Sequence, residues 1–276
     1  MSVVNALLRA LVDGLLYPFR GLPPIVGLTV VSLLTSILLL IVFKKTSNQK
    51  ALEAVKRKIH ACLFEIRLFN DDFRTILRAQ LEILRLNLTY LRHSMVPMVW
   101  TLPPLVLLIA QLQFHYGYES LRPGRPAVVK ATLHSGESTS KPAIRLEAPG
   151  GGVEVVEPPV WVPSLREMAW RIEPRAKGEY ELRLVNGSES VTKSVRVMEG
   201  SEPVVRRSPL RVRGFVDELL YPAEPPLPAG EFASISVSYP EADVDVFGFE
   251  LHWMIVYFAL SIAFAFALRG TFKVTI

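Results

Sequence analysis

The sequence predicts a membrane α-helical protein, with three transmembrane helices and a cytoplasmic helical hairpin, that also carries an extracytoplasmic all-β sandwich domain. Three observations lead to this fold class: an apolar composition, a basic helical pattern between the first two apolar stretches, and short β-rich segments before the third. The 276 residues are 50% hydrophobic and the mean hydropathy is +0.30, more apolar than an ordinary soluble domain.

Three charge-free stretches have the length of a transmembrane helix. A helix needs about 20 apolar residues to cross the hydrocarbon core of a bilayer. Residues 25–43, 95–112 and 251–268 are 19, 18 and 18 residues long and carry no charge, so each is predicted to be a transmembrane helix. Three prolines in the second stretch should kink it, because proline removes a helical hydrogen bond.

Residues 1–24 are predicted to form an amphipathic helix that lies in the external interface of the membrane. Its few charges are Arg9, Asp13 and Arg20. The apolar residues recur at helical spacing and are Leu7, Leu8, Leu11, Leu15 and Leu16. Pro18 should end this helix before the chain turns into the first span. The alternative is a helix that packs against the external domain.

Residues 44–94 are predicted to form a hairpin of two antiparallel helices, a short coiled coil. In the first arm, apolar residues alternate at spacings of three and four: Leu52, Val55, Ile59, Cys62 and Ile66. The second arm repeats the pattern, if Gln80 or Leu81 fills one gap, with Phe73, Leu77, Leu84, Leu88 and Leu91. Asn70 or Asp71 can cap the second helix. The alternative is one continuous helix of about 45 residues, which would extend some 70 Å.

Basic residues predict the orientation. The segment between the first two spans has eleven basic and five acidic residues, so the positive-inside rule places it in the cytoplasm. The tail, residues 269–276, carries Arg269 and Lys273 and should also be cytoplasmic, which leaves the N-terminus outside a cell (inner) membrane. Contacts with anionic lipid or the ribosome are expected of Lys44, Lys45, Lys56, Arg57 and Lys58.

A stripe of small polar residues predicts a cleft between the spans. On a helical projection one arc of about 120° contains Thr29, Ser32, Thr35 and Ser36. Hydroxyl groups gain nothing from facing lipid, so this arc should face protein or water, together with Gln111 and Ser261. The alternative is that the hydroxyls bond back to carbonyls of their own helix. A face for close helix packing is predicted from Ala259, Ala263 and Ala267.

The external segment, residues 113–250, is predicted to be an immunoglobulin-like β-sandwich. Seven short segments rich in β-branched residues are AVVKATL, AIRLEA, VEVVE, WRIEP, YELRLV, SVTKSVRVM and ASISVSY, and NGSE at 186–189 reads as a hairpin turn. Tyr180 follows a glycine at the start of a strand, like the tyrosine corner of such domains, with Leu182 where antibody domains have a cysteine. Trp170 is a candidate core residue.

Other chemistry is not indicated. The stretch RRSPLRVRG reads as a solvated loop, with lipid headgroups or a docking partner as the alternative reading of Arg206, Arg207, Arg211 and Arg213. Five scattered histidines and one cysteine supply no triad or zinc site, and no phosphate-binding loop is present. The sequence therefore predicts neither an enzyme nor a metal or cofactor site, and nucleic acid only through a ribosome.

Two stretches resemble the YidC/Oxa insertase superfamily, which includes three-span members. Residues 27–45, GLTVVSLLTSILLLIVFKK, look like its first core span, and residues 47–59, SNQKALEAVKRKI, look like the start of its cytoplasmic hairpin. The third span would match the last core span of that family. Two departures stand out: the family's intramembrane arginine is missing near residues 36–38, and three-span relatives generally lack such an external domain.

The resemblance implies a function without bond-making chemistry. In the first hypothesis the chain is an insertase or membrane chaperone that passes the polar flank of a hydrophobic client segment through the cleft. In the second it is a non-catalytic subunit of a larger membrane complex, with a partner subunit filling the cleft and an external protein docked on the β domain. In the third it is a sensor that couples external binding to movement of the hairpin.

Overall fold

The computed structural model describes residues 3–69, 71–134, 141–156, 158–187, 189–200, 203–272 and 274. The chain divides into two units, one of Met1–Leu28 with Leu107–Val256 and the other of Thr29–Val106 with Tyr257–Ile276. Lys273, Asn70 and Ser188, which the sequence assigns to the basic tail, the hairpin cap and the sandwich turn, lie outside the described residues.

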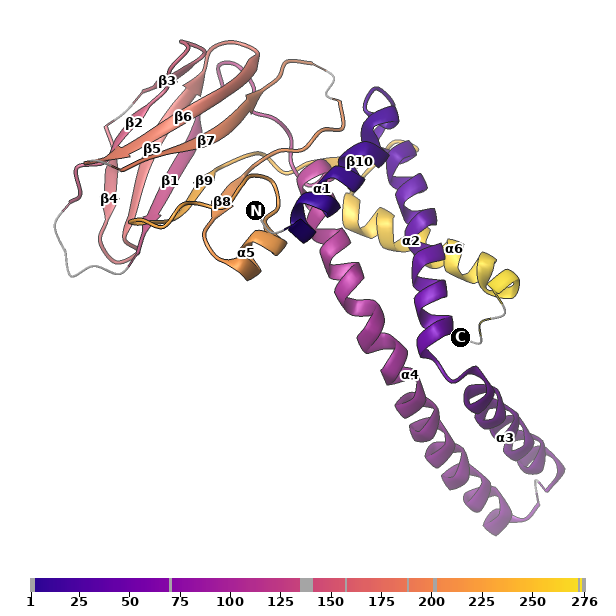
Figure 1. Cartoon of the computed structure of the whole chain (residues 1–276). Coiled ribbons are helices and arrows are strands. Elements are labelled where there is room, and N and C mark those ends of the chain that lie inside the picture. Colours follow the sequence, from indigo (N-terminus) through magenta and orange to yellow (C-terminus); the bar gives the residue numbers. More distant parts are fainter. Residues whose placement is uncertain are drawn as a thin grey trace. The chain divides into compact units, whose positions relative to one another are not determined.

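The first unit contains a β-sandwich made of two antiparallel sheets (Figure 1). The larger sheet has the order β3-β5-β1-β9-β8, with β4 also paired to β5. Its strands are β1 Ala127–Leu133, β3 Val153–Val155, β4 Val160–Val162, β5 Glu167–Pro174, β8 Leu210–Val212 and β9 Phe232–Val237. The smaller sheet has the order β2-β6-β7, with β2 Arg145–Glu147, β6 Gly178–Asn186 and β7 Glu189–Val197. All seven predicted segments contain a strand.

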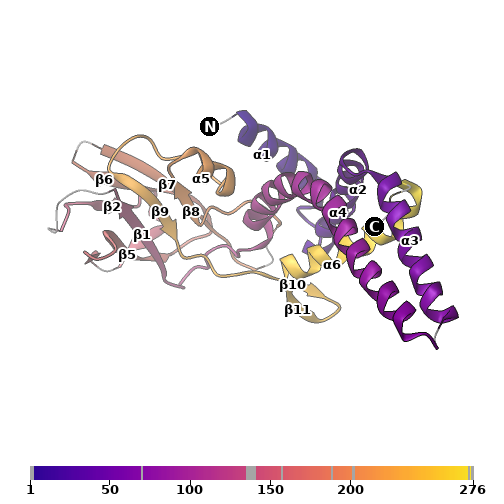
Figure 2. The same cartoon turned by 90° about the horizontal axis from the view of Figure 1, so that it is seen from below.

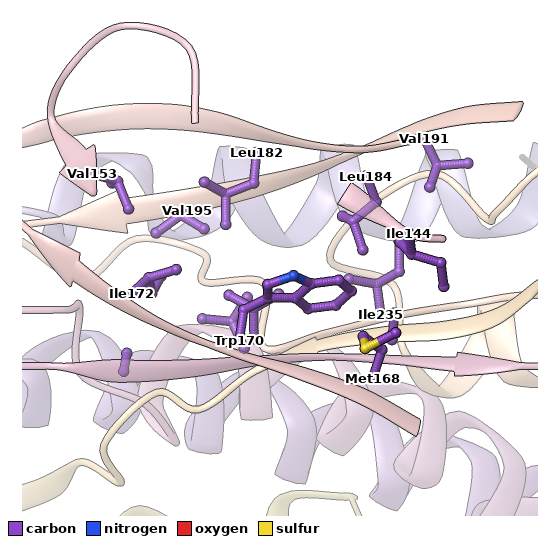
Figure 3. Packing of buried hydrophobic residues seen from close by; sticks show 14 of the residues in the cluster. Ile144, Val153, Met168, Trp170, Ile172, Leu182, Leu184, Val191, Val195 and Ile235 are labelled. Carbon is purple, nitrogen blue, oxygen red and sulfur yellow. The ribbon is translucent and has the colours of Figure 1, made fainter. Parts of the chain in front are cut away.

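Side chains from both sheets meet in one apolar core. Figure 3 shows the Trp170 ring of β5 between Leu182 and Leu184 of β6 on one side and Ile235 of β9 on the other. Along β5 and β6 these positions alternate with half-buried or exposed ones, which is why a period of two in the sequence predicted them. The predicted core position of Trp170 is confirmed, with 2% of its surface exposed.

The predicted tyrosine corner is also present. The Tyr180 hydroxyl donates a hydrogen bond to the Ala176 carbonyl at 3.0 Å, four residues upstream, and Leu182 is fully buried two residues later. The Tyr180 ring lies over Gly152, so closely that a β-carbon at Gly152 would overlap it. A residue with no side chain is therefore required where β3 begins.

Two further elements of this unit were not predicted as such. The hairpin of β10 Asp243–Val246 and β11 Phe249–His252 precedes the last helix (Figure 2). The short helix α5 Phe215–Leu220 follows β8.

Helix α1 Val3–Leu16, with the 3₁₀ turn Tyr17–Phe19, buries Val12 and Leu16 and leaves Leu7 and Leu11 exposed. One face of α1 therefore packs within the unit, as the alternative interpretation expected, and the other stays apolar and uncovered.

Four long helices account for the rest. They are α2 Pro24–Thr46, α3 Gln49–Leu68, α4 Phe73–Tyr116 and α6 Trp253–Phe272. Among the described residues, α2, α4 and α6 are the helices long and apolar enough to cross a membrane. Pro97, Pro103 and Pro104 lie inside α4, which continues for 44 residues.

Helices α3 and α4 form the predicted antiparallel hairpin and lie side by side in both views (Figures 1 and 2). Leu52 and Val55 of α3 are buried, as the sequence pattern indicated. The prediction for α4 is wrong, because the buried residues in its hairpin part are Ala79 and Leu86, whereas the expected leucines are exposed. This helix is apolar on two faces, and a pattern read from one face could not tell which of them meets α3.

The turn of the hairpin is capped differently from the prediction. Helix α4 starts one residue later than a cap at Asp71 would allow. The Asp72 carboxylate accepts a hydrogen bond from the Arg74 amide at 3.0 Å and one from the Thr75 hydroxyl at 2.6 Å. Burial on α3 and this cap fix the start of α4.

We expect Gly152→Ala to destabilise the sandwich by about 1–3 kcal/mol, because the new methyl group overlaps the Tyr180 ring. Urea unfolding of the detergent-solubilised chain, followed by near-UV circular dichroism, measures the effect. In a Tyr180→Ala background the same substitution should cost much less, since the overlapping ring is gone. An equal cost in both backgrounds would contradict this packing.

Candidate functional site

The second unit contains a groove between α2, α4 and α6. It has a volume of about 320 Å³ and is lined by Ser36, Leu39, Leu40, Phe43, Thr101, Leu105, Tyr257, Phe258, Ser261, Ile262 and Ala265. Among these lining residues four carry a hydroxyl group and none carries a charge. The groove is therefore a hydrocarbon-walled surface with a few weakly polar groups, which suits an apolar segment.

Two serines one turn apart join α2 to α6 at the side of this groove. The Ser36 hydroxyl lies 2.8 Å from the Ser261 carbonyl and 2.7 Å from the carbonyl of Ser32 in its own helix. The Ser32 hydroxyl lies 3.4 Å from the Tyr257 carbonyl. Their small side chains let the helix backbones approach each other, and their hydroxyl groups bond across the contact.

The remaining residues of the predicted polar stripe divide between different places. Thr35 is buried and donates to the Val31 carbonyl at 2.8 Å, as the back-bonding alternative expected. Thr29 is half-buried one turn before Ser32. Gln111 is buried in the other unit, where it donates to Asn5 at 3.2 Å. The structure therefore brings Ser32, Thr35, Ser36 and Ser261 together at the contact between α2 and α6, where Ser36 and Ser261 line the groove. Gln111 lies in the other unit.

The predicted close-packing face of α6 does not make the helix contact. Ala259, Ala263 and Ala267 are exposed, whereas Tyr257 and Ser261 are buried. Positions 257 and 261 lie about 200° around the helix from 259 and 263, since each residue turns the helix by about 100°. The serine and tyrosine contacts decide which face packs, and the alanines lie on the opposite side.

The basic residues singled out from the sequence are not gathered into one site. Lys44 and Lys45 are exposed in the last turn of α2, and Arg57 and Lys58 are exposed on α3. Lys56 is half-buried, with its ammonium group 5.6 Å from the centre of the Tyr90 ring in α4. This cation–π contact helps to hold the two arms of the hairpin together.

In the first unit, side chains from three segments meet in a polar junction, defined by Asn5, Asp13, Gln111, His115, Arg206 and Arg207. The Asp13 carboxylate of α1 accepts from His115 Nε2 of α4 at 2.9 Å and from Arg206 Nη2 at 3.1 Å. Burial raises the pKa of Asp13, but His115 and Arg206 outweigh this and lower the pKa to about 2. Asp13 therefore stays ionised at neutral pH.

Arg207 caps the last turn of α4. Its amide donates to the Phe114 carbonyl at 2.7 Å, and its guanidinium donates to the His115 carbonyl at 2.8 Å. Carbonyls at a helix C-terminus lack partners in their own helix and attract positive charge. Because Arg206 and Arg207 are largely buried here, their expected place in a solvated loop is wrong.

A buried ion pair lies between β7 and the segment after α5. Lys193 is fully buried, and its Nζ lies 2.5 Å from Glu224 Oε2 and 2.7 Å from the Ser208 hydroxyl. Burial lowers the pKa of Lys193 to about 8, against the opposing effect of Glu224. Burial raises the pKa of Glu224, but Lys193 outweighs it, so this pKa falls below its usual value. Both groups are therefore charged at neutral pH.

Sequence reasoning missed the junction and this ion pair. Asp13 is separated from His115 by 102 residues and from Arg206 by 193, so no spacing relates them. The burial of Lys193 could have been predicted from the sequence, because Lys193 occupies an inward position of an alternating strand between Val191 and Val195. A lysine at such a position needs a buried partner.

Comparisons with known proteins add little. No protein-family model matches the chain, and no curated protein matches it. The S-layer protein rSbsC is 18% identical with a TM-score of 0.25, over 30% of this chain and 12% of that one. Domains 4 and 5 of the S-layer protein SbsC are 18% identical with a TM-score of 0.23, over 30% of this chain and 47% of that one. The chain thus covers less than half of either structure, and the likeness carries no argument.

We expect Asp13→Asn to lower the stability of the first unit at neutral pH by about 1 kcal/mol, because it removes a partly exposed ion pair. The folded-state pKa of Asp13 is depressed from 3.8 to about 2, so its contribution is present above pH 4 and is lost as the pH falls toward 2.

Thermal unfolding of both proteins in detergent, at several values between pH 6 and pH 2, measures the difference. The gap between wild type and variant should shrink as the pH falls. Asp243→Asn, at an exposed position of β10, is the control and should have no such gap. A gap that is constant with pH would contradict the assignment.

Proposed function

We propose that the chain is an integral membrane protein similar to the YidC/Oxa insertases, and that it assists the insertion or assembly of hydrophobic segments through the groove. The observation that carries the proposal is an open, almost wholly apolar groove between three helices that are each long and apolar enough to span a membrane. Moving an apolar segment from water into such a groove is favourable by about 25 cal/mol per Å². In this proposal no bond is broken, so the chain is not an enzyme and uses no cofactor.

The order of elements supports the same proposal. A helical hairpin with exposed basic residues connects the first two apolar helices, and a third apolar helix completes the groove. We place the hairpin in the cytoplasm of a cell (inner) membrane, with the N-terminus outside, from the excess of basic residues in it. Its lysines would then meet anionic lipid or a ribosome, and the immunoglobulin-like domain would lie outside and be free to dock a protein.

A non-catalytic subunit is the second candidate. The described residues that line the groove include no charged side chain, and the polar flank of a passing segment would find few partners there. A partner helix that stays in the groove needs no such polar groups. In that case a stable membrane complex, held also through the external domain, would be the functional form.

Filling the groove tests the first candidate. Ala265→Trp places a large ring in the groove and should reduce insertion of a reporter membrane protein into proteoliposomes several-fold. Ala263→Trp is the matched control, because Ala263 lies on the exposed face of the same helix. Equal insertion by both variants would exclude the groove as the client path.

Photo-crosslinking separates the two candidates. A crosslinker at Ser36 should capture short-lived nascent chains if the chain is an insertase, and one stable protein if it is a subunit. The same reagent at Leu38, which is 46% exposed on the opposite face of α2, controls for random encounters in the membrane. Equal capture of clients from both positions would contradict a role for the groove.

A further inference from the structure

The exposed face of α4 carries an unbroken apolar stripe. Its members are separated alternately by four and three residues and are Leu77, Leu81, Leu84, Leu88, Leu91, Met95, Met98 and Leu102. Each of these side chains is between 42% and 62% exposed. We call this set the leucine stripe. Spacings of four and three, sustained over more than three heptads, are typical of a coiled-coil seam.

The leucine stripe is not the face that packs on α3. Ala79 and Leu86 are buried in the hairpin, and Tyr90 contacts Lys56 of α3. In heptad positions the stripe occupies a and d, whereas the residues turned toward α3 occupy c and f. The two seams therefore lie on opposite sides of α4, and the leucine stripe remains uncovered by the described part of the chain.

The first half of the stripe must face water rather than lipid. The positions directly after three of its leucines are arginines, Arg78, Arg85 and Arg92, all of them exposed. A helix with arginine at every e position is unsuited to the hydrocarbon core. The five leucines of this half line one face of a water-facing helix and form a large apolar patch. Such patches usually mark an interface.

We propose that the leucine stripe of α4 pairs in parallel with the same stripe of a second copy of this chain. The charges beside the seam fit this partner. In the first half of the stripe the e positions are the three arginines, and the g positions are Gln80, Asn87 and Ser94, none of them charged. In a parallel pair each e position faces a g position of the other helix, so Arg85 meets Gln80 and Arg92 meets Asn87.

An antiparallel pair would be disfavoured by the same residues. It brings e positions opposite e positions, so three arginines would face three arginines across the seam. In the single chain the Asn87 side-chain amide donates to the Ile83 carbonyl of its own helix at 3.0 Å. Its side-chain oxygen can then accept from a guanidinium in the parallel pair. Two copies inserted with the same orientation in one membrane also carry their α4 helices parallel, which is the arrangement that these charges favour.

The stripe is continuous with the apolar part of α4. Met95, Met98 and Leu102 extend it beyond the arginines, where Ser94 and Thr101 at g positions are small enough for close helix approach. Pro97, Pro103 and Pro104 occupy b and c positions, away from the seam. One interface can therefore continue from the hairpin into the apolar segment.

Disulfide crosslinking tests the proposal on the full chain in membranes. In a Cys62→Ser background, Leu77→Cys, Leu84→Cys and Leu91→Cys each place a thiol at a d position, where the two helices of a parallel pair come close enough for a disulfide. After mild oxidation each variant should give about ten-fold more disulfide-linked dimer than Glu82→Cys, an exposed b-position control two residues from Leu84.

Each alternative gives a different result. Crosslinking at only one or two of the three positions would show that the pair is not parallel and in register, and capture of another protein would show a different partner. Either outcome overturns the proposal, and so does the absence of any dimer at all three positions. Light scattering of the wild type and of Leu81→Glu/Leu88→Glu in detergent is a second measurement. The wild type should be dimeric and the variant monomeric with unchanged helix content, because both leucines are exposed in the single chain.

Discussion

The backbone carbonyl groups in the last turn of α4 have no partners within their own helix. The hydrogen bonds that other segments donate to them organise the first unit. Arg207 donates to two of these carbonyls, while His115 in the same turn contacts Asp13, which also pairs with Arg206. Neighbouring arginines in one short segment thus bind the end of α4 and the helix α1. The segment between β7 and β8 is held against both helices by charge as well as by apolar packing.

In the second unit, polar groups serve helix contact more than they serve the groove. Ser32 and Ser36 use their hydroxyls on carbonyls of α6 and α2, so the groove keeps a mainly hydrocarbon wall. A groove of this kind favours apolar occupants by burial of surface and distinguishes poorly among them. A groove with so few polar groups fits both candidate functions: an apolar segment that passes through it, or a partner helix that stays in it.

Local patterns predicted the elements well, and contacts between distant residues much less well. The alternation around Trp170 and the glycine before Tyr180 are short-range signals, so the strands, the core tryptophan and the tyrosine corner followed from sequence. The packing faces of α4 and α6 could not be predicted from sequence, because both helices are apolar on two faces. Tertiary contacts determine which of the two faces packs. Asp13, His115 and Arg206 meet only after folding, so their cluster left no pattern in the chain.

The core of the sandwich has a consequence for where the domain can mature. The sandwich contains no cysteine, because the sole thiol of the chain, Cys62, belongs to the hairpin. The domain is thus held together without any covalent staple, by packing around Trp170 and by the Lys193–Glu224 pair. It can reach its native state equally in a reducing or an oxidising compartment, and its export would demand no oxidoreductase.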